Sequence, residues 1–252
     1  MRDLSLATER RGHGPRLVLA HGFTQTGRSW GAVADDLADD HEVLTPDAPG
    51  HGGASDITAD LGQAGALLAE HGPATFIGYS MGGRMCLHTA LARPDVVDRL
   101  VLLGATAGIE DADERAARRH SDDELADSIE RDGVEAFLDR WLGLPMFARL
   151  PADPAGRAER ARNTAAGLAS SLRCAGAGTQ EPTWDRLAGL TMPVLVMAGA
   201  DDHKFVTLGR RLAAAIGRNA SFAAVPDAGH AAHSEQPDAF LWLLRGWLSA
   251  TA

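Results

Sequence analysis

The chain has 252 residues, a formal net charge of −10 at pH 7 and a hydrophobic content of 45%. This length and composition are ordinary for a globular domain with its own core, and they exclude disordered, collagen-like and coiled-coil proteins. The acidic balance repels phosphate backbones and anionic lipid, so we expect no nucleic-acid partner and no binding to membrane surfaces.

Short apolar segments alternate with amphipathic segments along most of the chain. The apolar runs predict strands at residues 17–20, 43–44, 75–78, 100–104, 193–197 and 220–225. The segments between and after them have helical spacing, at residues 30–37, 57–68, 81–91, 208–216 and 237–248. Apolar runs separated by helices are typical of parallel strands that are covered on both faces. We therefore expect an α/β protein with a doubly wound, mostly parallel sheet.

This alternation is interrupted between residues 108 and 190. The stretch is rich in Ala, Arg, Asp and Glu, with helical spacing and no strand-like run. We expect residues 1–107 and 191–252 to form the sheet-containing core, and residues 108–190 to form an inserted helical cap. In open α/β sheets the ligand binds beyond the carboxyl ends of the strands, and we expect the cap to lie there.

The cellular setting is predicted from the rest of the composition. No apolar stretch approaches the ~20 residues of a membrane span, and residues 1–4 lack the apolar core of a signal peptide. The two cysteines, Cys86 and Cys174, are far apart in the chain. We expect a cytoplasmic protein, either a monomer or a weak homodimer.

A nucleophile motif follows the predicted strand at 75–78. The sequence Gly78-Tyr79-Ser80-Met81-Gly82 matches G-x-S-x-G, and a predicted helix comes directly after it. In that setting the glycines allow a tight strand-to-helix turn that exposes the serine hydroxyl above the sheet. We therefore predict Ser80 as the nucleophile.

A serine hydroxyl needs a general base, and the base needs an orienting acid. His230 follows an Ala-Gly turn before the last predicted helix, and Asp201 and Asp202 follow the predicted strand at 193–197. The chain order Ser, Asp, His is that of α/β hydrolases. We predict the triad Ser80, Asp202 and His230, with Asp201 facing solvent.

Metal binding is an alternative use of the same residues, because His203 and His233 lie near Asp202 and His230 in the sequence. The cluster has no short-spaced ligand signature, and a triad already explains two of its members. We expect no metal and no cofactor.

An oxyanion hole requires two backbone N–H donors. We predict one from Met81, the residue after the nucleophile, and the other from Phe23, in His21-Gly22-Phe23 after the first predicted strand. The loop from Asp47 to Gly52 is expected beside this hole in a structural role.

Arg84 lies four residues after Ser80, so both side chains are expected on one face of the helix. A cation in the first turn is unfavourable there because the helix dipole is positive at that end. Arg84 therefore either pairs with a capping carboxylate or binds an anionic ligand.

With these motifs together, the chain resembles the 2-succinyl-6-hydroxy-2,4-cyclohexadiene-1-carboxylate synthase family of menaquinone biosynthesis, within the α/β-hydrolase superfamily. The resemblance runs from about His21 to the end of the chain. It is carried by the loops above, by the arginine after the nucleophile turn, and by further elements at Arg115-x-x-Arg118, Trp141-x-x-x-Pro145-x-Phe147, Arg162, Asp202-His203-Lys204-Phe205 and Gly229-His230-Ala231-Ala232-His233.

The resemblance implies a cofactor-free lyase acting on a small polycarboxylate. The triad would initiate proton abstraction from the ring and pyruvate would be expelled, with Ser80 either the base itself or the group that positions it. The resemblance implies substrate contacts from Arg84, Arg118, Arg162, Tyr79, Trp141 and Phe147. Without it, Arg118 and Arg115 can be explained as solvated helix partners of Glu114 and Asp111, four positions earlier, and little else anchors Arg162 at the site.

Two other functions use the same residues. A serine hydrolase, either a carboxylesterase or a carbon–carbon bond hydrolase, shares the triad and the oxyanion hole. Neutral esters, however, have no use for several buried cations. A small-molecule receptor with slow turnover is the remaining alternative.

Overall fold

A computed structural model describes residues 5–251. Residues 1–4, on which the expected absence of a signal peptide rests, lie outside the described residues. Seven strands form one sheet in the order β1-β3-β2-β4-β5-β6-β7. They are β1 (Thr8–Arg11), β2 (Arg16–Ala20), β3 (Glu42–Pro46), β4 (Ala74–Tyr79), β5 (Val97–Leu103), β6 (Val194–Gly199) and β7 (Ala220–Val225). All neighbouring pairs are parallel except β1 with β3. The predicted doubly wound, mostly parallel sheet is confirmed.

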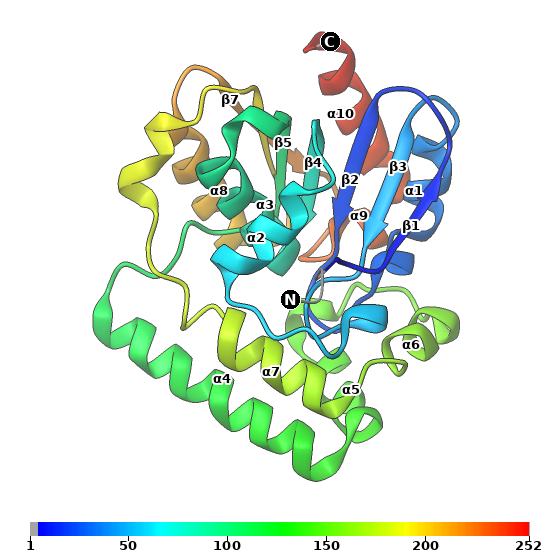
Figure 1. The fold of residues 1–252 in the computed structure, drawn as a ribbon, viewed down its shortest axis with the longest axis vertical. Coiled ribbons are helices and arrows are strands. Elements are labelled where there is room, and N and C mark those ends of the chain that lie inside the picture. Colours follow the sequence, from blue (N-terminus) through cyan, green and yellow to red (C-terminus); the bar gives the residue numbers. More distant parts are fainter. Residues whose placement is uncertain (1–4, 252) are drawn as a thin grey trace.

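Helices cover both faces of the sheet (Figure 1). One face carries α1 (Gly31–Leu37), α9 (Ala232–Glu235) and α10 (Pro237–Ala250), and the other carries α2 (Leu61–Ala69), α3 (Met81–Ala92) and α8 (His203–Ile216). Strand side chains alternate between faces. Leu17 and Leu19 of β2 therefore pack with the first group, and Val18 and Ala20 pack with the second.

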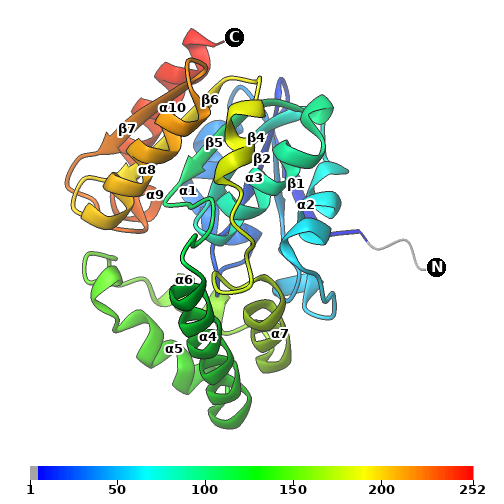
Figure 2. The same cartoon turned by 90° about the vertical axis from the view of Figure 1, so that its left-hand side faces the viewer.

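Between β5 and β6 the chain is helical, with no strand in the described structure of this stretch. It contains α4 (Ala112–Asp132), α5 (Val134–Leu142), α6 (Pro154–Arg160) and α7 (Ala165–Ala175). Apolar side chains of α4, α5 and α7 form a small core of their own, which includes Ile129, Phe137 and Leu168. Figures 1 and 2 both show these helices grouped at one end of the sheet.

Short 3-10 helices complete the chain: η1 (Gly27–Trp30), η2 (Gly52–Ala54), η3 (Pro94–Val96), η4 (Pro145–Phe147) and η5 (Trp184–Gly189). Across residues 5–251, no helix combines the length and the apolarity that crossing a bilayer requires.

Two details differ from the sequence expectations, for physical reasons. The edge strand β1 was not predicted because its four residues, Thr8–Arg11, contain no apolar run. Helix α8 begins at His203 and not near residue 208, since Asp202 caps it by accepting the Phe205 N–H. Its first two residues, His203 and Lys204, are polar, and its buried residues begin only at Gly209.

Candidate active site

Ser80 lies at the turn between β4 and α3 and has a left-handed backbone, with φ of 51°. That conformation is strained for a residue with a side chain, and such strain is concentrated at functional sites. The turn is tight enough to require glycine on both sides. A Cβ on Gly78 would lie 2.4 Å from the carbonyl oxygen of Gly82, and a Cβ on Gly82 would lie 2.2 Å from that of Ala20.

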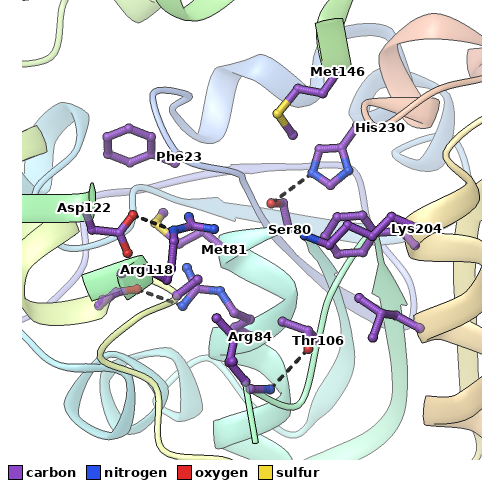
Figure 3. Close-up of a pocket in the computed structure, with 18 of the residues that line it drawn as sticks. Phe23, Ser80, Met81, Arg84, Thr106, Arg118, Asp122, Met146, Lys204 and His230 are labelled. Atoms are coloured by element: carbon purple, nitrogen blue, oxygen red, sulfur yellow. Dashed lines mark hydrogen bonds and ion pairs between the residues drawn. The ribbon is translucent and has the colours of Figure 1, made fainter. Parts of the chain in front are cut away.

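The structure brings Ser80, His230 and Asp202 together, and Figure 3 shows the contact between Ser80 and His230. The distance from His230 Nδ1 to Asp202 Oδ2 is 2.7 Å, and that from His230 Nε2 to Ser80 Oγ is 3.3 Å. With Nδ1–H donating to the carboxylate, Nε2 is free to accept the hydroxyl proton of Ser80. Asp201 instead pairs with Arg149 at 2.7 Å and is exposed. The acid beside the imidazole is therefore Asp202.

The two predicted oxyanion donors follow two neighbouring strands of the sheet, β4 and β2. Met81 is the first residue of α3, and Phe23 follows the end of β2. Among the described residues, neither backbone N–H has a hydrogen-bond partner within the protein. Both donors are therefore available to an oxygen in the cavity, which is the condition for an oxyanion hole.

Two buried histidines fix the loops around these donors. Nε2 of His21 accepts the Ala48 N–H at 2.9 Å, and Nε2 of His51 accepts the Thr24 N–H at 3.3 Å. Burial lowers the pKa of His21 to about 4 and that of His51 to about 3. Both rings are therefore neutral at pH 7 and can serve as acceptors.

A cavity of about 710 Å³ connects the Ser80–His230 pair to the helices between β5 and β6. Its walls include residues of β4, α3, α4, α5, α7 and α8, so both the sheet and the inserted helices contribute. All the predicted site residues except Arg162 line it, namely Phe23, Tyr79, Ser80, Met81, Arg84, Arg118, Trp141, Phe147, Asp202 and His230.

Arg84 is 9% exposed and lies in the first turn of α3. Its Nη1 donates to the carbonyl oxygen of Ala175 at 2.8 Å, and within the described structure it has no carboxylate partner. Burial, reinforced by the nearby Arg118, lowers the pKa of the Arg84 guanidinium to about 10. Of the two roles that the sequence left open, pairing with a capping carboxylate is therefore not observed.

Arg118 lines the same cavity but does have a protein partner. Its Nε lies 2.8 Å from Oδ1 of Asp122, one turn later on α4. The arginine side chain is 45% exposed, whereas that of Asp122 is 4% exposed. Figure 3 shows this pair on the same side of the cavity as Arg84. The pair leaves part of the guanidinium free toward the cavity.

The structure does not bring Arg162 into the cavity, and the expectation for this residue is corrected. Its side chain is 58% exposed and pairs with Glu159 at 3.3 Å. The residue that lines the cavity is Arg160, which is 7% exposed and donates to Oγ1 of Thr24. Burial lowers the pKa of Arg160, and it too has no carboxylate partner in the described structure. Nothing in this Ala- and Arg-rich stretch indicates which arginine faces inward, because packing against Thr24 decides it.

Three aromatic side chains complete the walls. Tyr79 is buried, with its ring centre 5.4 Å from that of His230. Trp141 lies 5.4 Å from Phe23 and 5.7 Å from Phe147 between ring centres. The Nε1–H of Trp141 is buried without a partner in the described structure.

No group of three metal-ligating side chains occurs among residues 5–251. His233, considered above as a ligand, packs instead between Tyr79 and Trp30, with ring centres 4.5 and 4.6 Å away. Burial lowers its pKa to about 3. His233 is thus a neutral residue of the core in this structure.

Comparison with known proteins agrees with this geometry. Residues 17–241 match the α/β-hydrolase family model, and the chain therefore belongs to the α/β-hydrolase family. It is an enzyme of that type, and within the family it is similar to proteins named 2-succinyl-6-hydroxy-2,4-cyclohexadiene-1-carboxylate synthase. The relative from Serratia proteamaculans is 32% identical, covering 93% of both chains. The relative from Escherichia coli O1:K1 is also 32% identical, covering 88% of this chain and 89% of its own.

Two solved structures superpose on this chain over nearly its whole length. MenH from S. aureus superposes with a TM-score of 0.89 at 28% identity, covering 97% of this chain and 98% of its own. An esterase from Thermogutta terrifontis superposes with a TM-score of 0.83 at 24% identity, covering 98% and 93%, which shows a shared fold alone.

Proposed function

We propose that this enzyme is a lyase that eliminates pyruvate from 2-succinyl-5-enolpyruvyl-6-hydroxy-3-cyclohexene-1-carboxylate to give 2-succinyl-6-hydroxy-2,4-cyclohexadiene-1-carboxylate. The observation that carries the proposal is a pair of buried guanidinium groups, Arg84 and Arg160, facing the cavity that contains Ser80 and His230. Neither has a carboxylate partner among the described residues. Burying an unpaired charge is costly unless a ligand supplies the counter-charge.

The substrate's chemistry matches this charge distribution. It has a ring carboxylate, a succinyl carboxylate and an enolpyruvyl carboxylate, and each can form charge-assisted hydrogen bonds with a guanidinium. Arg84 and Arg160 are assigned to two of these groups, and the free part of Arg118 is available to the third. The names of the relatives support the same product.

The reaction requires one proton acceptor and one oxyanion site. The Ser80–His230 pair accepts the proton from the ring carbon that bears the succinyl group. The electron pair moves to the succinyl carbonyl oxygen, where the N–H groups of Phe23 and Met81 stabilise the negative charge. When the pair returns, the ring double bonds shift, the carbon–oxygen bond to the enolpyruvyl group breaks, and the released enolpyruvate takes up a proton to become pyruvate.

The other residues hold the ring and exclude water. Asp202 orients His230 and stabilises it when it is protonated. Tyr79, Trp141 and Phe147 supply apolar walls. Residues 108–190 act as the cap that closes the site over the sheet, and they supply Arg118 and Arg160.

A coupled assay tests the proposal. An upstream synthase generates the precursor in situ, and pyruvate release is followed together with absorbance of the conjugated diene. A neutral p-nitrophenyl ester is measured in parallel. Fast, equimolar formation of pyruvate and diene with slow ester cleavage is the expected result. Fast ester cleavage without pyruvate release would instead assign the enzyme to the serine hydrolases.

A further inference from the structure

Thr24, the residue after the proposed oxyanion donor Phe23, has a strained backbone. It is fully buried and has φ of 69°, in the left-handed region that few residues with side chains adopt. Such a conformation costs about 1–3 kcal/mol and persists only where surrounding contacts hold it. The contacts that hold Thr24 therefore control the shape of the oxyanion loop.

Side chains from two other segments bind every polar group of Thr24. Its N–H donates to Nε2 of His51 at 3.3 Å, and its carbonyl oxygen accepts from Nδ2 of Asn163 at 2.7 Å. Its Oγ1 accepts a hydrogen bond from Nη1 of Arg160. Two of these three contacts come from the inserted helical region and only one from the core.

The peptide that carries the Phe23 N–H is held within its own loop. The carbonyl oxygen of Gly22 accepts from Nδ1 of His21 at 2.9 Å and from the Gln25 N–H at 3.1 Å. In a trans peptide the N–H points opposite to the carbonyl. These bonds therefore fix the direction in which the Phe23 N–H points. Thr24 is joined to Phe23 by the next peptide, so a displacement of Thr24 would change the direction of this N–H.

The side-chain amide of Asn163 joins three parts of this arrangement. It is 4% exposed, and its Nδ2 also donates to the carbonyl oxygen of Arg160 at 2.9 Å. Its Oδ1 accepts the Gly52 N–H at 2.9 Å. The amide group thus joins the oxyanion loop, the loop around residues 47–53 and the end of α6, and its orientation is fixed on both sides.

We propose that Asn163 is a positioning residue that holds Thr24 in its left-handed conformation and so aims the Phe23 N–H at the oxyanion. The inference rests on the oxyanion role of Phe23 in the proposed function. In this proposal the inserted helical region has two roles: it lines the substrate cavity and it positions one of the oxyanion donors.

The test compares Asn163→Asp with a matched control, Asn219→Asp. Asn219 donates through Nδ2 to two carbonyl oxygens, those of Leu190 and Met192, and none of these three residues lines the cavity. Each substitution replaces a double donor by an acceptor of equal size. The readouts are the rate of Ser80 modification by a fluorophosphonate, the kcat and KM for p-nitrophenyl acetate, and the melting temperature.

The fluorophosphonate is informative because its phosphoryl oxygen must enter the oxyanion hole while Ser80 Oγ bonds to phosphorus and fluoride leaves. We expect Asn163→Asp to slow labelling and kcat about 10- to 100-fold with KM within about threefold. This is less than the roughly 10²- to 10³-fold loss when an oxyanion donor is removed, because the Phe23 N–H is displaced and not deleted. Asn219→Asp should lower the melting temperature while labelling stays within about twofold of the wild type.

Equal labelling rates in Asn163→Asp and the wild type would overturn the inference, as would equal losses in both variants. If Asn163→Asp does not fold, Asn163→Ala provides the same comparison with a milder change. Labelling does not require lyase turnover. A wild-type enzyme that labels quickly but releases no pyruvate would therefore contradict the proposed function and leave this inference standing.

Discussion

Replacing Arg84 by methionine should make the ligand-free protein as stable as the wild type or more stable, although the residue is buried. A guanidinium pKa lowered from 12.5 to about 10 corresponds to a cost of about 3 kcal/mol for the charged form in the folded protein. At pH 7 the group is charged in both the folded and the unfolded state, so the whole cost is present. Methionine removes it.

The substitution also removes one favourable contact. The carbonyl oxygen of Ala175 loses the hydrogen bond from Arg84, and an unsatisfied buried carbonyl costs about 1–3 kcal/mol. The net change in the free energy of unfolding is therefore about 0 to +2 kcal/mol. For a chain of this size, +2 kcal/mol raises the melting temperature by about 4–8 °C.

Thermal unfolding with and without succinate measures both consequences, with Arg118→Met as the control. Succinate should raise the melting temperature of the wild type and have little effect on Arg84→Met. The control should destabilise the protein by about 1 kcal/mol, because it leaves the buried carboxylate of Asp122 without its partner. A loss of more than about 2 kcal/mol in Arg84→Met, with the succinate response retained, would refute the reasoning and make Arg84 a structural residue.

The remaining predictions concern the triad, the corrected arginine and the buried histidines. Ser80→Ala should lower kcat by at least about 10⁴-fold because the triad acts as a unit, and near-normal pyruvate release in that variant would contradict the mechanism. Arg160→Met should lower kcat/KM at least 30-fold, equivalent to about 2 kcal/mol, whereas Arg162→Met should leave it within about twofold of the wild type. A large loss in Arg162→Met and a small one in Arg160→Met, measured by steady-state kinetics, would restore the sequence expectation. The free energy of unfolding should decrease as the pH is lowered from about 6.5. In this range the histidines of the unfolded chain take up protons, whereas the buried histidines of the folded protein stay neutral down to about pH 3–4. The decrease is about 1.4 kcal/mol per pH unit for each buried histidine. Three of these histidines, His21, His51 and His233, are fully enclosed, and burial also lowers the pKa of His71 and His88. Denaturant titrations between pH 6.5 and 5, above the range where most carboxylates titrate, should therefore show a slope that drops by less than one third when one of the first three is replaced by glutamine. An unchanged slope would count against the neutrality of the replaced histidine.

Local sequence patterns predicted the sheet and the nucleophile region because their causes are local. The apolar runs of β2, β4, β5 and β6 must be buried on both faces, and the glycines around Ser80 are required by contacts with near neighbours. The position of Asp202 is set in the same way, since it lies three residues after β6 and caps α8.

The inserted helical region could not be predicted to the same level, because long-range packing decides which of its side chains face the cavity. Arg157, Arg160 and Arg162 have similar local surroundings in the sequence. Only the contact with Thr24 brings Arg160 inward, while Arg157 pairs with acidic residues of α5. The strained φ of Thr24 is likewise invisible in the sequence, since it depends on Asn163, 139 positions away.

The most direct test of the account measures two reactions in the wild type and in Arg84→Met: elimination of pyruvate from the cyclohexene substrate and hydrolysis of p-nitrophenyl acetate. We predict that the ratio of their kcat/KM values falls at least 30-fold in the variant, equivalent to about 2 kcal/mol, with ester hydrolysis within about threefold of the wild type. This result would mean that the triad is intact and that the lost interaction belongs to the anionic substrate. An unchanged ratio would contradict the claim that the buried arginine recognises a substrate carboxylate.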